Sequence, residues 1–93
     1  MHAQVVPAMP RTLDELANHQ EAIVVAVQDQ GGALSPELLR RLVEIGFLPG
    51  ERVCVVARGL FGGNPLAVRV GTATFALRRM EARCVQISTD TSR

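Results

Sequence analysis

Two histidines, two cysteines and a glutamate are the side chains in this sequence best suited to bind a metal ion: His2, His19, Glu21, Cys54 and Cys84. No three of them fall on one face of an expected strand or helix at the spacing that metal ligands need. Each cysteine adjoins valines in a β-type run and the two are far from a Cys-x-x-Cys spacing, which predicts buried, unreactive thiols. We therefore predict no metal site and no required cofactor. The alternative is a weak surface site for zinc or a similar divalent ion, shared between two molecules.

Catalysis would need a nucleophile beside a base, or a pair of carboxylates in a protected site. The acidic residues instead alternate with arginines on faces expected to meet water, and both histidines lie outside the periodic apolar pattern. The sequence contains no lysine, which excludes Schiff-base catalysis and a P-loop. We predict that the protein is not an enzyme.

The charge of the chain is nearly balanced, with ten arginines against nine acidic residues and a formal net charge of +1. Such a chain has no long-range field that would attract nucleic acid or an anionic membrane. Arg78, Arg79 and Arg83 form a local cluster, so a small nucleic-acid-binding barrel is the alternative, and its binding would weaken steeply with salt. Against it, the chain has no Tyr or Trp and three Phe, too few rings for stacking on bases.

The N-terminal segment lacks the cationic start and long apolar run of a signal peptide. The longest purely apolar run, 22–27, has six residues, against the roughly 20 that a membrane helix needs. These features predict a cytoplasmic protein that does not insert into the membrane.

A glycine-rich stretch, 58–65, carries two apolar side chains, Leu60 and Phe61, and we predict a long mobile loop there. Apolar side chains on a loop suit docking onto an apolar surface of a protein partner. The alternative is that Phe61 folds over the barrel as a lid on the core. The candidate partner-binding residues are Leu60, Phe61, Arg78 and Arg79.

The element that organises the chain is a helix predicted near 35–45. Ser35 is a suitable N-cap and a proline follows it at the first helical position. Apolar residues, Leu42 among them, recur at helical spacing and predict a buried face. Gly46 predicts a left-handed stop that lets Phe47 fold back onto Leu42. The opposite face carries two pairs of opposite charge four residues apart, Glu37 with Arg41 and Arg40 with Glu44.

Two turns and five short strands follow from glycine, proline and β-branched residues. Pro49 and Gly50 predict a type II turn directly after the helix, and Gly71 predicts a type II′ hairpin. The predicted strands are 22–27, 52–57, 66–70, 73–77 and 84–87.

Three details complete the prediction. Thr12 and Glu15 fit a capping box, which indicates a short helix near 12–17. The first strand is apolar throughout, which is typical of a strand covered on both faces, and Phe75 is assigned to the core face of the fourth strand. A 3₁₀ turn is expected at 78–81 before the last strand.

Together these elements predict a mainly β fold with short helices, a small SH3-like antiparallel barrel of about five strands. The barrel is expected to span residues 12–88, with an N-terminal arm at 1–11 and a polar tail at 89–93.

The pattern resembles the FeoA family of bacterial ferrous iron transport systems. The motif positions that carry the resemblance are Leu42, Gly46, Pro49, Gly50, Gly71 and Leu77, with the strands around them. The resemblance implies an SH3-like, non-catalytic cytosolic accessory protein whose partner is FeoB, a membrane permease with a GTP-binding cytosolic domain. The same domain type also occurs in metal-dependent repressors, where it follows a DNA-binding and a metal-binding domain. Whether the chain forms a homodimer stays open.

Overall fold

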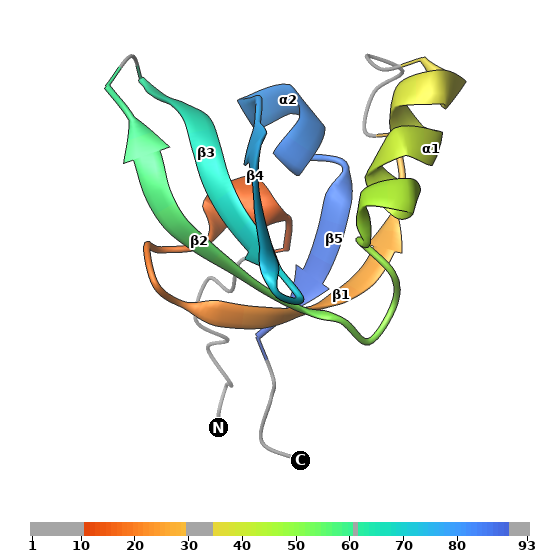
Figure 1. Cartoon of the computed structure of the whole chain (residues 1–93), viewed down its shortest axis with the longest axis horizontal. Helices are drawn as coiled ribbons and strands as arrows, with labels where there is room; N and C mark the ends of the chain where they lie inside the picture. Colours follow the sequence, from red (N-terminus) through yellow and green to blue (C-terminus); the bar gives the residue numbers. More distant parts are fainter. Residues whose placement is uncertain (1–10, 30–34, 61, 90–93) are drawn as a thin grey trace, which may run out of the picture.

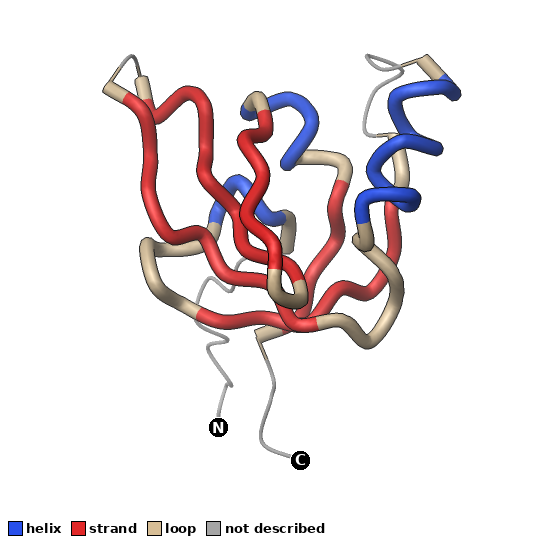
Figure 2. Tube along the Cα trace, in the orientation of Figure 1, coloured by secondary structure: helices blue, strands red, loops and turns tan. Residues whose placement is uncertain are grey.

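The computed structural model describes residues 11–29, 35–60 and 62–89. The described part of the chain folds into one five-stranded antiparallel sheet in the order β4-β3-β2-β1-β5, which curls on itself with the helices around it (Figures 1 and 2). The elements are η1 (Leu13–Glu15, a 3₁₀ turn), β1 (Glu21–Val27), α1 (Pro36–Ile45), β2 (Arg52–Gly59), β3 (Gly63–Val70), β4 (Ala73–Leu77), α2 (Arg79–Ala82) and β5 (Val85–Ser88). The predicted mainly β architecture is confirmed. None of the helices within these ranges is long and apolar enough to cross a membrane.

The ends of α1 form as the sequence predicts. The hydroxyl of Ser35 accepts a hydrogen bond from the Leu38 N–H at 3.2 Å, which satisfies one of the free amides of the first turn. At the other end Gly46 has φ 132°, and the Phe47 N–H donates to the Leu42 carbonyl at 3.1 Å. This is the Schellman arrangement expected when glycine ends a helix, and it turns Phe47 into the core.

Both predicted turns are also confirmed. The Glu51 N–H donates to the Leu48 carbonyl at 3.0 Å, with φ 93° at Gly50, as a type II turn requires. Gly71 has φ 61° in the two-residue connection between β3 and β4, where Val70 pairs with Ala73.

One hydrophobic core lies between the curled sheet, η1 and the start of β2. It is built of aliphatic side chains from every strand together with one aromatic ring, and its members that are at most 1% exposed include Leu13, Leu16, Val24, Phe47, Val53, Val55, Leu66, Val68 and Val85. Cys54 and Cys84 are buried and free, as predicted.

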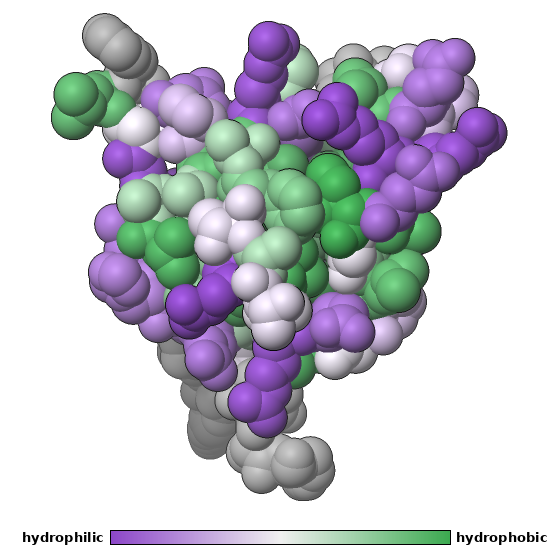
Figure 3. Space-filling view, viewed as in Figure 1, coloured by the Kyte–Doolittle hydropathy of each residue, from purple (hydrophilic) through white to green (hydrophobic). Residues whose placement is uncertain are grey.

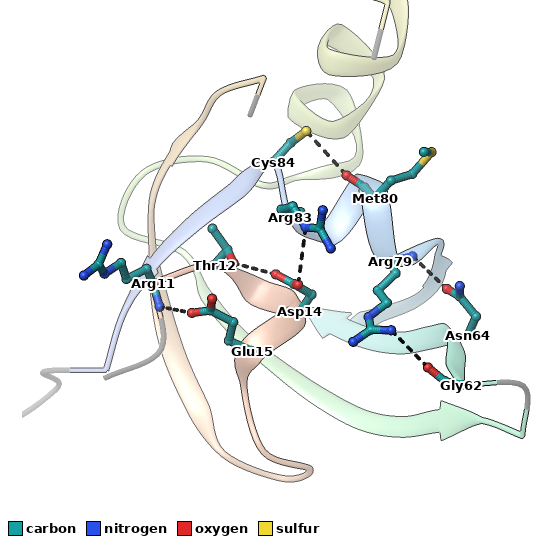
Figure 4. A network of polar contacts seen from close by, with 10 residues as sticks. All are labelled: Arg11, Thr12, Asp14, Glu15, Gly62, Asn64, Arg79, Met80, Arg83 and Cys84. Atoms are coloured by element: carbon teal, nitrogen blue, oxygen red, sulfur yellow. Dashed lines mark hydrogen bonds and ion pairs between the residues drawn. The ribbon is translucent and has the colours of Figure 1, made fainter. Parts of the chain in front are cut away.

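Two predictions for the N-terminal third are wrong. Val25 in β1 is 49% exposed, so the strand is not fully covered on both faces: Ala22 and Val24 are buried on the core side, whereas Val25 is exposed. The capping box at Thr12 does not form either, because the Thr12 backbone bridges to β5 and its hydroxyl bonds to Asp14. Glu15 instead accepts from the Arg11 N–H at 2.7 Å, and the helix shrinks to η1 (Figure 4).

The predicted long loop at 58–65 is also wrong. β2 continues to Gly59 and β3 begins at Gly63, and these two glycines pair across the hairpin, so the connection is short. Phe61 lies outside the described residues. The segment before β5 is the α-helix α2 rather than a 3₁₀ turn, with the Glu81 carboxylate accepting from the Arg78 N–H at 2.7 Å at its start.

Candidate protein-binding surface

The side chains considered as candidate metal ligands do not form a cluster among the described residues. Within the described ranges, no group of three or more His, Cys, Asp or Glu side chains is close enough to hold a metal ion. The thiol of Cys84 donates to the Met80 carbonyl at 3.5 Å, and the thiol of Cys54 bonds to the carbonyl of Val55 at 3.8 Å (Figure 4 shows the Cys84 contact). Both thiols therefore point at backbone, and His2 lies outside the described residues.

A groove lies on the surface between α1, the start of β3 and the end of β4. It has a volume of about 580 Å³, and its walls are mostly apolar: Leu38, Arg41, Leu42, Ile45, Pro65, Phe75, Ala76, Leu77, Arg78 and Glu81. Figure 3 shows apolar side chains gathered in the middle of this face, with hydrophilic side chains around them. The volume falls within the range of about 300–1,000 Å³ typical of ligand pockets.

The groove exists because α1 does not bury its whole apolar stripe. Leu42 is its only fully buried residue, whereas Leu38 and Ile45 are half-buried and line the groove. On the opposite wall Phe75 lies on the same face of β4 as the buried Leu77 and packs against the core, as assigned, but it is only half-buried. Phe75 packs against the core cluster, and its ring also lines the groove.

Three charged side chains stand at the rim of the groove: Arg41, Arg78 and Glu81. The predicted ion pairs along α1 do not form, and the ion pairs found in the described part of the chain join Arg52 to Glu21 and Arg83 to Asp14. Arg41 and Arg78 therefore keep guanidinium groups without a carboxylate partner there. With two guanidinium groups against one carboxylate, the rim is positive.

The predicted partner-binding residues divide between two places. Arg78 stands at the groove, whereas Arg79 faces the other way: its N–H donates to the Asn64 side-chain oxygen at 2.8 Å and its guanidinium to the Gly62 carbonyl at 3.4 Å (Figure 4). Arg79 thus ties α2 to the end of the β2–β3 hairpin. Leu60, in that hairpin connection, is 93% exposed.

Four residues that line the groove were not predicted as binding residues from the sequence: Leu38, Arg41, Ile45 and Phe75. The sequence does contain an indication of the groove: the apolar stripe of α1 is wider than a helix on a small barrel can bury. Which part of the stripe stays open depends on where α1 lies against β4, and that is a tertiary contact.

Comparison with known proteins gives one family. The family model described as FeoA domain matches residues 11–89. A crystal structure of Stenotrophomonas maltophilia FeoA complexed with zinc, described as possibly a ferrous iron transport activating factor, is 46% identical, covers 85% of this chain and 91% of its own, and superposes with a TM-score of 0.74. No curated protein matches the sequence significantly.

Two further solved structures are similar at lower identity. Iron(II) transport protein A of Clostridium thermocellum is 27% identical over 83% of this chain and 44% of its own, with a TM-score of 0.70. A manganese-dependent transcriptional repressor is 27% identical over 89% of this chain and 44% of its own, with a TM-score of 0.69. The S. maltophilia protein is described as an SH3 domain protein, which agrees with the predicted fold.

Proposed function

Because the chain belongs to the FeoA domain family, we propose that it is a non-catalytic cytosolic accessory protein of bacterial ferrous iron uptake, and that it binds the cytosolic GTP-binding domain of the permease FeoB. The family match across residues 11–89 is the observation that carries this proposal. The description of the S. maltophilia relative as a possible activating factor for ferrous iron transport supports it. Binding, rather than catalysis, is the activity expected of a surface built from apolar side chains and arginines.

Leu60 is the strongest candidate for the FeoB contact among the described residues. Its side chain is 93% exposed, and an aliphatic side chain presented at the end of a hairpin suits a protein interface. Arg79 of α2 donates hydrogen bonds to Asn64 and Gly62 at the end of the β2–β3 hairpin. These bonds help to hold in place the hairpin end that carries Leu60. Phe61, its neighbour in sequence, is proposed to act with it.

The test is a calorimetric titration of the purified FeoB cytosolic domain with the full chain and with the variant Leu60→Asp. We expect the variant to melt at the wild-type temperature, since the side chain touches little of the fold, and to lose measurable binding. Leu48→Asp is the matched control, because Leu48 is 44% exposed in the turn after α1. Binding by Leu60→Asp as tight as wild type would move the partner site elsewhere, and absence of binding by the wild type would contradict the proposed function.

A further inference from the structure

The two edge strands of the sheet, β5 and β4, differ in whether another segment of the chain pairs with their outer edge. The outer edge of β5 is covered, because Thr12 bridges to Gln86 and the Ile87 N–H donates to the Arg11 carbonyl at 2.9 Å. β4, at the other end, pairs with β3 on one side and with no further strand in the described ranges. Exposed strand edges usually carry charges, prolines or bulges that prevent pairing with another chain. β4 reads Ala-Thr-Phe-Ala-Leu and has none of these.

The hairpin geometry defines which backbone groups β4 presents. In a two-residue hairpin the closing pair, here Val70 and Ala73, exchanges hydrogen bonds, and bonded and non-bonded pairs then alternate along an antiparallel ladder. Phe75 and Leu77 therefore direct their N–H and C=O groups at β3. Those of Thr74 and Ala76 point away from the sheet, and Ala76 is itself a wall residue of the groove.

The free edge and the groove together form a site for an extended chain. A peptide lying along β4 would receive backbone hydrogen bonds at Thr74 and Ala76, and since side chains alternate along a strand, every second one would enter the groove. There it would meet Leu38 and Ile45 of α1 and the ring of Phe75. The positive rim at Arg41 and Arg78 favours acidic residues beside the apolar one.

We propose that this site binds an extended segment of a partner protein, which adds to β4 as a further strand, inserts an aliphatic side chain into the groove and places acidic residues against Arg41 and Arg78. The segment needs no proline-rich sequence, because its affinity comes from the strand edge and the groove rather than from aromatic rings. The proposal goes beyond the Leu60 contact and does not depend on FeoB supplying the segment.

The test uses random peptides displayed on phage, selected against the immobilised full chain, with the best peptide then synthesised and titrated by fluorescence anisotropy. We expect the selected peptides to share alternating aliphatic positions flanked by Asp or Glu. In the wild-type protein, hydrogen exchange at the Thr74 and Ala76 amides should slow when the peptide binds, while the Ala67 amide in β3 should be unchanged. This measurement needs no variant.

Two pairs of variants distinguish the contribution of backbone hydrogen bonding at β4 from that of the positive charge at the groove rim. Ala76→Pro removes the outward N–H, and we expect peptide affinity to fall about tenfold or more, whereas Ala76→Ser keeps the N–H and should bind like wild type. Arg41→Glu should weaken binding of the acidic peptide by a similar factor. Arg40→Glu makes the same charge change at the neighbouring exposed residue of α1, which does not line the groove, and should not weaken binding.

Three outcomes would overturn the proposal. The first is that no peptide is enriched. The second is that enriched peptides bind Ala76→Pro and Arg41→Glu as tightly as wild type, with no slowing of exchange at Thr74 and Ala76. The third is that sedimentation shows the wild-type chain to be a dimer that Ala76→Pro dissociates, because the occupant of the β4 edge is then a second copy of this chain.

Discussion

Gly59 is the described glycine at which the fold leaves the least room. A Cβ added there would lie 1.9 Å from the Asn64 carbonyl oxygen, a backbone atom that cannot move aside without shifting the β2–β3 hairpin. At Gly62 an added Cβ meets nothing within 4 Å, and the left-handed φ of 66° is the main cost. The two positions therefore separate a steric constraint from a conformational one.

We expect Gly59→Ala to destabilise the protein by about 1–3 kcal/mol or more, because the hairpin must shift to relieve the overlap. Gly62→Ala, the control in the same hairpin end, should cost about 1 kcal/mol. Urea denaturation of both variants measures the difference. Equal stabilities would mean that the close approach at Gly59 is relieved without cost.

Phe47 and Phe75 give a second prediction at the residue scale. Phe47 is fully buried, so Phe47→Ala should cost about 3–5 kcal/mol. Phe75 is half-buried at the wall of the groove, so Phe75→Ala should cost only about 1–2 kcal/mol. Thermal melting of both variants checks the order. A larger loss for Phe75→Ala would show that the half-buried Phe75 ring contributes more to the stability of the core than the fully buried Phe47.

Among the elements, α1 buries little for its length, because only Leu42 of its ten residues is fully buried. Its stability therefore depends more than usual on its own caps. The Ser35 cap at the N-terminus and the Schellman arrangement at Gly46 set both ends, and they also fix where the groove wall stands against β4.

We expect Ser35→Ala to destabilise the protein by about 0.5–2 kcal/mol, since the Leu38 N–H loses its acceptor. Ser35→Asp should retain most of the wild-type stability, because a carboxylate accepts the same hydrogen bond and interacts well with a helix N-terminus. The check is the midpoint of urea denaturation for each variant. If alanine and aspartate cost the same, the side chain at position 35 does not cap the helix in solution.

At the scale of the whole molecule, the core is one cluster of mostly aliphatic side chains that includes the fully buried ring of Phe47, and we expect its packing to hold the fold together without a metal ion. A structural zinc ion would contribute several kcal/mol, so its removal would be conspicuous. The zinc in the S. maltophilia relative makes the measurement worthwhile.

We expect exhaustive chelation to leave the melting temperature of this protein unchanged. Re-addition of zinc after chelation is the control for damage caused by the chelator itself. A fall of more than about 10 °C that zinc reverses would correspond to over ~1 kcal/mol and would show that an ion supports the fold.

Several parts of this protein can be predicted from residues that are neighbours along the chain. The Ser35 cap, the stop at Gly46, the turn at Gly50 and the hairpin at Gly71 each follow from backbone preferences over a few residues, and all four are found in the structure. Five strands follow from β-branched runs between such signals. The family resemblance rests on the same motif residues, and the family model matches.

Which surfaces stay exposed depends instead on contacts between elements that are distant in the sequence. Alternation along β4 places Phe75 on the core face but does not say that its ring stays half-exposed at a groove, and the apolar run of β1 does not say that Val25 faces water. The hydrogen bonds of Arg79 to Asn64 and Gly62 likewise depend on the end of the β2–β3 hairpin lying beside α2. Each of these depends on contacts between residues far apart in the sequence, which local preferences do not encode, because the side chain's environment is set by whichever element folds against it.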